Sequence, residues 1–192
     1  TLKRFNVSRL EEFSTTSKIG NPYTTKSSFD KFIFAYENDN WVKLYKPLDE
    51  KKYKFQYLGT KEQGFIFVFK QLPENGELLI ITGGEKDVMT LAAKGFNAIT
   101  LNSETATLPK NIVDELKLRF KTILVLYDND ETGLKQSNIL AVAHGLHRLV
   151  LPTLQNNGKD ISDYFANGET LEKFNALLLT ALDGFPLASE VQ

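Results

Sequence analysis

Acidic residues gather in three pairs between residues 85 and 163: Glu85 with Asp87, Asp128 with Asp130, and Asp160 with Asp163. The first two pairs each follow a short apolar run rich in β-branched residues, which is typical of a buried parallel strand. Ligands of open α/β sheets bind at the carboxyl ends of such strands. Carboxylates that converge there raise one another's pKa unless a cation joins them. Oxygen ligands without His or Cys favour Mg²⁺ or Mn²⁺, so the sequence predicts a divalent-cation site.

The spacing within two of the pairs leaves two interpretations open. Asp128 and Asp130 stand two apart, so their carboxylates face one side if the strand conformation persists, although ordinary turns also produce this pattern. Asp160 and Asp163 share a helical face at i and i+3, where Asp160 is equally well placed to cap the helix. The acids are therefore either ligands or local caps.

The elements that must position these acids follow an alternating β-α pattern. Apolar runs at 78–82, 97–101, 122–127 and 148–151 predict four strands, and helices are expected over 87–94, from 109, over 131–144, and as a last pair from 158. Gly95 is a typical residue to end the first helix. Strands joined by helical crossovers predict a Rossmann-like four-stranded parallel sheet, within an α/β domain over 76–192.

The first half of the chain has a different pattern. Residues 1–30 are expected to form a tether with a short helix, which a capping box at Ser8 would open. Residues 31–75 predict a small basic antiparallel β subdomain, with strands at 32–36, 41–46, 53–58 and 64–69 and a hairpin turn at 38–40. In the third strand Tyr53, Phe55 and Tyr57 alternate with polar residues. Such a stripe either stacks on nucleic-acid bases or, more commonly, forms the core.

Charge divides the chain unequally. Residues 1–75 carry 13 Lys and Arg against 9 Asp and Glu, a net charge of +4, whereas residues 76–192 carry 10 against 15, a net charge of −5. This asymmetry is compatible with a polyanion held beside metal-binding acids, or simply with two solvated surfaces. Candidate phosphate contacts in the basic half are Lys43, Lys46 and Lys54.

Composition excludes several classes of protein. The 192 residues include no Cys, so this segment has no disulfide framework and no thiolate zinc site. No apolar run approaches the roughly 18 residues of a membrane helix, and no signal peptide opens the chain, so we expect no membrane partner and a cytoplasmic location. There is no phosphate-binding GxxxxGK[ST] loop. Because the sequence opens on Thr1, we expect it to be part of a longer polypeptide.

The three acidic motifs in their order resemble the Toprim domain, and within it the primase and phage-type primase-helicase branch. The segments that carry the resemblance are 84–87, 128–133 and 158–163, and the segments 42–47 and 57–59 are similar to the small subdomain that precedes Toprim in phage-type primase-helicases. Altogether the resemblance covers about residues 32–165 and implies a Toprim fold preceded by an antiparallel, aromatic-rich β subdomain.

The resemblance implies a DNA primase-type nucleotidyltransferase of DNA replication, from a mobile element or phage, that synthesises RNA primers on single-stranded DNA. Catalysis would rest on Glu85, Asp87, Asp128 and Asp130, and Mg²⁺ or Mn²⁺ would bind Asp128, Asp130 and Asp160. Lys86 and Lys159 would contact nucleotide phosphates. Single-stranded DNA and nucleoside triphosphates are the implied partners, and flanking zinc-binding and helicase domains are expected in the full protein.

One position departs from the family pattern. Toprim motifs begin with a Glu that has acid-base or metal-binding duty, and here that position is Gly83. Glu85 points to the opposite side if the strand continues, and Glu104, at the end of the neighbouring strand, is an alternative carboxylate. Two other hypotheses therefore stand beside the primase: a non-catalytic nucleic-acid-binding module of a larger helicase, and a Toprim nuclease.

Overall fold

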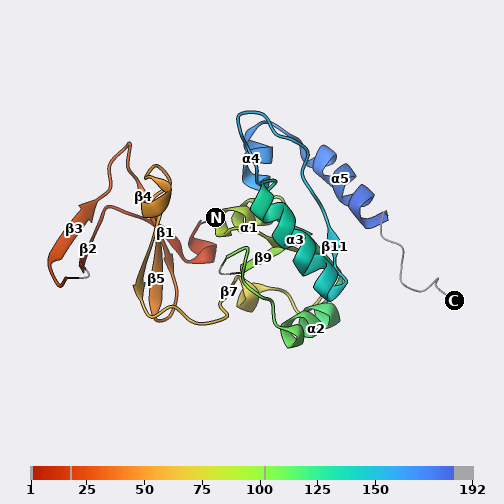
Figure 1. Cartoon of the computed structure of the whole chain (residues 1–192), viewed down its shortest axis with the longest axis horizontal. Coiled ribbons are helices and arrows are strands. Elements are labelled where there is room, and N and C mark those ends of the chain that lie inside the picture. Colours follow the sequence, from red (N-terminus) through yellow and green to blue (C-terminus); the bar gives the residue numbers. More distant parts are fainter. Residues whose placement is uncertain (1, 18, 102, 184–192) are drawn as a thin grey trace. The chain divides into compact units, whose positions relative to one another are not determined.

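A computed structural model describes residues 2–17, 19–101 and 103–183 of the chain (Figure 1). The chain forms two compact units, Thr1–Gln63 and Gly64–Gln192. The boundary lies twelve residues before the one expected after residue 75, because strand β7 (Ile66–Phe67) pairs with the sheet of the second unit. The expectation that residues 64–69 belong to the antiparallel subdomain is therefore wrong.

The first unit is built on an antiparallel sheet in the order β1-β4-β5-β6. Its elements are 3₁₀ turns at Leu2–Phe5 and Lys51–Tyr53, and strands β1 (Val7–Leu10), β2 (Glu12–Thr16), β3 (Pro22–Lys26), β4 (Ile33–Glu37), β5 (Trp41–Tyr45) and β6 (Phe55–Gly59). The hairpin turn predicted at residues 38–40 is confirmed, since β4 and β5 pair across it. One face of the sheet is aliphatic, and its residues Ile33, Ala35 and Leu44 form a core together with Phe13 of β2.

The predicted tether with a short helix is wrong. Ser8 lies within strand β1, which pairs with β4 in a register that sets Val7 opposite Tyr36. This pairing buries Val7, and one apolar strand face outweighs the local capping-box preference for a helix. The Thr-rich stretch that follows forms the β2-β3 hairpin, where Gly20 adopts the positive φ of +85° that a tight turn requires.

The second unit is built on a five-stranded mixed sheet in the order β11-β10-β8-β9-β7. The four neighbours β11, β10, β8 and β9 are parallel, as predicted, and β7 joins β9 as an antiparallel edge strand that was not predicted. The elements are a 3₁₀ turn at Phe69–Gln71, strands β8 (Gly76–Thr82), β9 (Asn97–Leu101), β10 (Phe120–Leu126) and β11 (His147–Arg148), and helices α1 (Glu85–Ala93), α2 (Lys110–Arg119), α3 (Glu131–His144), α4 (Ile161–Ala166) and α5 (Leu171–Asp183).

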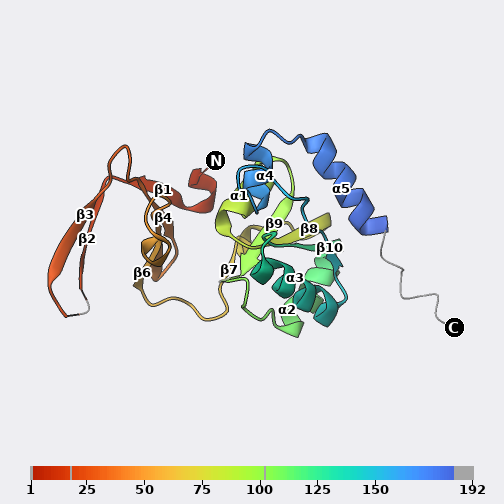
Figure 2. The same ribbon diagram turned by 45° about the horizontal axis from the view of Figure 1, so that its top comes forward.

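Helices cover both faces of this sheet. Figure 2 shows α2 and α3 on one side and α1, α4 and α5 on the other. Alternation along the strands explains the arrangement, because Leu79, Ile81 and Val125 join the core that includes residues of α2 and α3, whereas Ile80 and Leu124 face the other way and are fully buried. Strands with both faces buried therefore read as continuous apolar runs, which is why the sequence located them.

Helix ends agree closely with the sequence. The predicted helix 131–144 is confirmed as α3, and Gly95 follows α1 with a positive φ of +91°, as predicted. Within the described residues, no helix is both long and apolar enough to cross a membrane.

Candidate metal centre

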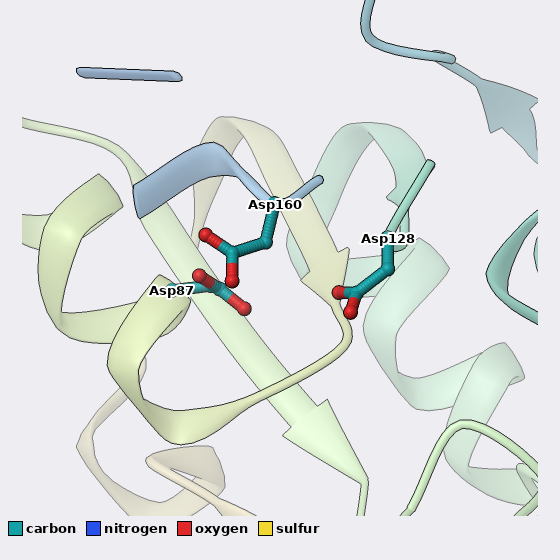
Figure 3. Close-up of side chains that lie close together, drawn as sticks. All are labelled: Asp87, Asp128 and Asp160. Carbon is teal, nitrogen blue, oxygen red and sulfur yellow. The ribbon is translucent and has the colours of Figure 1, made fainter. Parts of the chain in front are cut away.

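Three aspartates from distant parts of the sequence converge at one edge of the second unit. One carboxylate oxygen each from Asp87, Asp128 and Asp160 lies within 4.8 Å of the others. Figure 3 shows the three carboxylates turned toward one another, from α1, from the loop after β10, and from the start of α4. Asp87 and Asp160 are buried and Asp128 is half-buried, so the group lies inside the protein rather than on its surface.

Sheet topology brings these residues together. Strands β8 and β10 are parallel neighbours that pair Thr82 with Leu126, so both chains leave the sheet at the same edge. Helix α1 begins three residues after Thr82 and places Asp87 in its first turn. Asp128 is the second residue after β10, and Asp160 is the N-cap of α4, which packs against α1. The site therefore lies at the carboxyl ends of parallel strands, as the sequence predicted.

Asp87 is the most deeply buried of the three, with 3% of its surface exposed. Its Oδ1 accepts a hydrogen bond of 2.7 Å from Oγ of Ser162, which in turn lies 2.9 Å from Oγ1 of Thr90. Burial, and then the charge of Asp160, raises the pKa of Asp87 to about 7. A carboxyl group whose charged form is so poorly compensated is a favourable partner for a bound cation.

Asp160 caps a helix, which was one of the two interpretations of the sequence, and it also pairs with a lysine; its role as a metal ligand stays a prediction. Its Oδ1 caps α4 by accepting a 2.8 Å hydrogen bond from the backbone N–H of Asp163. Its Oδ2 accepts one of 2.7 Å from Nζ of Lys86, which also lies 3.7 Å from Asp163. Burial alone would lower the pKa of Lys86, but the surrounding carboxylates outweigh it and raise that pKa. Lys86 thus stays charged beside the three aspartates.

Lys159 joins the second acidic pair to the site. Its Nζ lies 2.6 Å from Oδ2 of Asp128 and 2.7 Å from Oδ2 of Asp130, and these two carboxylates raise the pKa of Lys159 despite its partial burial. Asp130 caps α3 by accepting a 2.9 Å hydrogen bond from the backbone N–H of Gly133, which is the largest cause of the lowered pKa of Asp130. Asp128 and Asp130 therefore both pair with the ammonium group of Lys159, but only Asp128 belongs to the three-aspartate group.

Glu85 and Glu104, the two candidates for the carboxylate missing at position 83, differ in their position relative to the aspartate group. Glu85 is the first residue of α1 and is not among the three converging carboxylates. Glu104 is half-buried, and burial, followed by the charges of Asp128 and Asp130, raises the pKa of Glu104 to about 7. A Cβ atom at position 83 would lie 2.8 Å from Oε1 of Glu104 and 3.0 Å from Oδ1 of Asp128. The Glu104 carboxylate therefore borders the site and Glu85 does not contribute to the aspartate group.

The candidate phosphate-binding lysines of the first unit have varied surroundings. Lys43 is only 7% exposed, and its Nζ lies 4.5 Å from the centroid of the Phe55 ring in a cation-π contact. Lys46 is paired with Asp49 at 3.7 Å, and its backbone N–H donates to the carbonyl of Lys54. Lys54 is half-buried at the start of β6. Their role toward phosphate stays a prediction.

The aromatic stripe of the third predicted strand is not a core. Tyr53, Phe55 and Tyr57 are 55%, 50% and 41% exposed, so the core interpretation is wrong. Strand pairing places Phe55 opposite Tyr45 and Tyr57 opposite Lys43, on the face away from the aliphatic core. The aliphatic residues of the other face fill the core instead, which leaves rings and lysines together on this face.

Sequence reasoning missed Ser162 and Thr90. Ser162 donates to the most buried carboxylate of the site, and Thr90 lies behind it on the next turn of α1. Ser162 lies within the motif 158–163, but only the charged residues of that motif were predicted to act, and Thr90 lies in no motif. The sequence shows only that Ser162 lies in the first turn of a predicted helix. This position does not by itself indicate a contact with Asp87.

The donor set fits a hard divalent cation. All three converging ligands are carboxylates, and the chain has no Cys, so the group suits Mg²⁺ or Mn²⁺ and not a thiolate zinc site. Two charged lysines border the group, with Nζ of Lys86 2.7 Å from Asp160 and Nζ of Lys159 2.6 Å from Asp128. A cation there would neutralise the charge that burial makes costly.

Comparison with known proteins rests on the fold. No protein-family model matches the sequence, and no curated protein matches it. The primase fragment of the bacteriophage T7 primase-helicase matches with a TM-score of 0.57 and 18% identity, over 83% of this chain and 66% of that one. The DnaG primase catalytic domain bound to single-stranded DNA matches with a TM-score of 0.60 and 17% identity, over 87% and 57%. The chain has the fold of a primase catalytic core.

A third structure supports the same conclusion. The Escherichia coli primase catalytic core matches with a TM-score of 0.57 and 17% identity, over 87% of this chain and 56% of that one. The chain therefore spans roughly three fifths of the length of these primase structures. The fold agrees with the resemblance to the primase branch of the Toprim domain that the three acidic motifs carry.

Proposed function

We propose that this chain is the core of a DNA primase-type enzyme that joins ribonucleotides on single-stranded DNA by metal-dependent phosphoryl transfer. The observation that carries the proposal is the convergence of Asp87, Asp128 and Asp160 within 4.8 Å, in a fold shared with primase catalytic cores. Carboxylate groups at the end of parallel strands are suited to hold a cation against a triphosphate.

In this proposal the aspartates bind the metal ion and the lysines contact the nucleotide. Asp87, Asp128 and Asp160 would hold Mg²⁺ or Mn²⁺, which when bound supplies charge stabilisation for the attacking hydroxyl and the leaving pyrophosphate. Lys86 and Lys159 lie at 2.7 and 2.6 Å from the metal-binding carboxylates Asp160 and Asp128, so each is placed to contact a phosphate oxygen once a nucleotide enters. Their charge is retained because the neighbouring carboxylates raise both pKa values.

The partners follow from the same proposal. Single-stranded DNA would serve as template and nucleoside triphosphates as substrates. The basic first unit, with lysines beside aromatic rings, offers both phosphate neutralisation and stacking surfaces to a single strand. Flanking zinc-binding and helicase domains would be supplied by other parts of a longer polypeptide.

The test is primer synthesis on a single-stranded template with Mg²⁺ or Mn²⁺, measured with the complete protein and with this chain. Asp128→Asn should reduce synthesis at least about a hundredfold, because it removes a charged ligand at nearly constant shape. Asp114→Asn, on the exposed surface of α2, is the matched control and should leave synthesis unchanged. Absence of synthesis by the complete wild-type protein under all these conditions would reject the proposal.

A second function has its own support. Gly83 removes the first acid of the Toprim pattern, and the exposed rings of Phe55 and Tyr57 lie on a face that also carries lysines. A non-catalytic module would bind single-stranded DNA in a salt-sensitive manner, and Asp128→Asn would not weaken that binding. Phe55→Ala should weaken it about fivefold or more if the ring stacks on a base. Metal-dependent nicking without nucleotides would indicate a nuclease instead.

A further inference from the structure

We propose that Glu104 supplies the carboxylate that the Toprim pattern places at position 83, and that it binds the same divalent cation as Asp128. This inference rests on the proposed function, since it adds one residue to that metal site. The pattern begins with a Glu, and Gly83 cannot provide a carboxylate. The carboxylate that lies next to Gly83 is that of Glu104.

The carboxylate of Glu104 lies where a side chain at position 83 would begin. A Cβ atom on residue 83 would meet Oε1 of Glu104 at 2.8 Å and Oδ1 of Asp128 at 3.0 Å. Both oxygens therefore lie about 3 Å from one point beside the end of β8, and 2.8 Å is closer than a real Cβ atom approaches an oxygen. A side chain at position 83 and the present position of Glu104 are thus mutually exclusive.

Strand order explains how a residue so far along the chain reaches this point. Strand β9 is the parallel neighbour of β8 and pairs Thr100 with Thr82. Both strands leave the sheet at the edge where the aspartates converge, so a long side chain after β9 can reach the space in front of β8. Glu104 follows β9 by three residues and has the length to do so. A different strand can therefore deliver the same chemical group.

The surroundings of Glu104 identify a ligand rather than a solvated surface acid. Glu104 is half-buried, and its carboxylate accepts a hydrogen bond from the backbone of Asp128. The carboxylates of Asp128 and Asp130 act on it electrostatically, and the nearby cation Lys159 already bridges those two aspartates. Half-burying another carboxylate here is unfavourable until a second cation joins the group.

Mutual exclusion makes a swap experiment decisive. The proteins compared are the wild type, Glu104→Gln, Glu104→Ala, and the double variant Gly83→Glu with Glu104→Ala, which moves the carboxylate to the position of the family pattern. Asp128→Asn is the positive control for a lost ligand. Glu77→Gln is the neutral control, because Glu77 lies at the opposite end of β8 with an exposed side chain. Thermal unfolding monitored by circular dichroism confirms that each variant is folded.

Two readouts are measured: Mn²⁺ affinity by calorimetry with the metal alone, and primer synthesis. Glu104→Gln and Glu104→Ala should weaken Mn²⁺ binding about tenfold or more and reduce synthesis about a hundredfold. The double variant should recover Mn²⁺ affinity to within about threefold of the wild type, because only the origin of the carboxylate has changed. Glu77→Gln should change neither readout.

The outcomes separate the two proposals. If Glu104→Gln binds Mn²⁺ as the wild type does, or if the wild type binds no Mn²⁺, the inference about Glu104 is overturned. If a folded double variant fails to regain affinity over Glu104→Ala, relocation of the carboxylate is overturned as well. If the wild type binds Mn²⁺ through Glu104 but the complete protein makes no primer, the primase function fails while the assignment of Glu104 stands.

Discussion

The ammonium group of Lys159 lies 2.6 Å from Oδ2 of Asp128, where it neutralises a carboxylate that also belongs to the aspartate group. A divalent cation bound by Asp128 would be repelled by this charge. Lys159→Met should therefore strengthen Mn²⁺ binding about three- to tenfold at low ionic strength, as the removal of one charge a few ångströms away implies. Calorimetry with Mn²⁺ measures the change.

The same substitution should impair nucleotide use, because Lys159 is proposed to contact a phosphate. The KM for nucleoside triphosphates should rise while Mn²⁺ affinity improves, and this opposite movement distinguishes a phosphate contact from a simple structural lysine. Lys121→Met is the control, since Lys121 pairs with Glu77 on the surface. Weaker Mn²⁺ binding in Lys159→Met would contradict the prediction.

Stability without metal should fall as the pH rises from about 4 to about 7. Burial raises the pKa of Asp87 from 3.8 to about 7, so in this window the folded protein keeps a proton that the unfolded chain has released. A group that binds more protons in the folded state makes unfolding easier as pH increases. Thermal unfolding with a metal chelator measures this slope.

Asp87→Asn should flatten this pH dependence, because the neutral amide cannot titrate. Glu104, whose pKa is also raised to about 7, should leave a residual slope in that variant. Addition of Mn²⁺ at pH 7 should raise the melting temperature of the wild type more than that of Asp87→Asn. Identical pH profiles for the two proteins would show that Asp87 is not the buried titrating group.

Ser162→Ala should destabilise the protein at pH 7. The Ser162 hydroxyl donates a 2.7 Å hydrogen bond to the buried Asp87 carboxylate, and loss of a hydrogen bond to a charged group costs about 1.5 to 3 kcal/mol. Because Asp87 is partly protonated at this pH, we expect about 1 to 2 kcal/mol in the free energy of unfolding from denaturant titration. Ser14→Ala, which loses an exposed hydroxyl pair with Thr24, should cost less than about 0.5 kcal/mol.

Gly133→Ala should disturb the aspartate loop. A Cβ atom on Gly133 would collide with the backbone carbonyl oxygen of Asp128, so the loop or the start of α3 must shift. We expect a loss of about 1 to 3 kcal/mol in unfolding free energy, together with weaker Mn²⁺ binding. Glu131→Ala, on the exposed first turn of α3, should have little effect on stability. Unchanged metal affinity in Gly133→Ala would show that the loop adapts without moving Asp128.

The sequence by itself determined the parallel sheet and the edge at which its acids gather. Continuous apolar runs such as 122–127 identify strands buried on both faces, and the acids directly after them mark the strand ends. The end of α1 followed from a local glycine signal at Gly95, which acts within a few residues. Such features can be predicted from the sequence because the interacting residues lie within a few positions of one another.

Only the tertiary structure decided which side chains meet. Asp130 and Asp128 are two residues apart, yet Asp130 turns to its helix while Asp160, distant in sequence, completes the aspartate group. The strands β1 to β3 were missed for the same reason, since Val7 becomes a strand residue by pairing with β4 and not by local preference. The sequence offered Glu104 as an alternative carboxylate, but its contact with the space beside Gly83 depends on the adjacency of β8 and β9, which no local pattern contains.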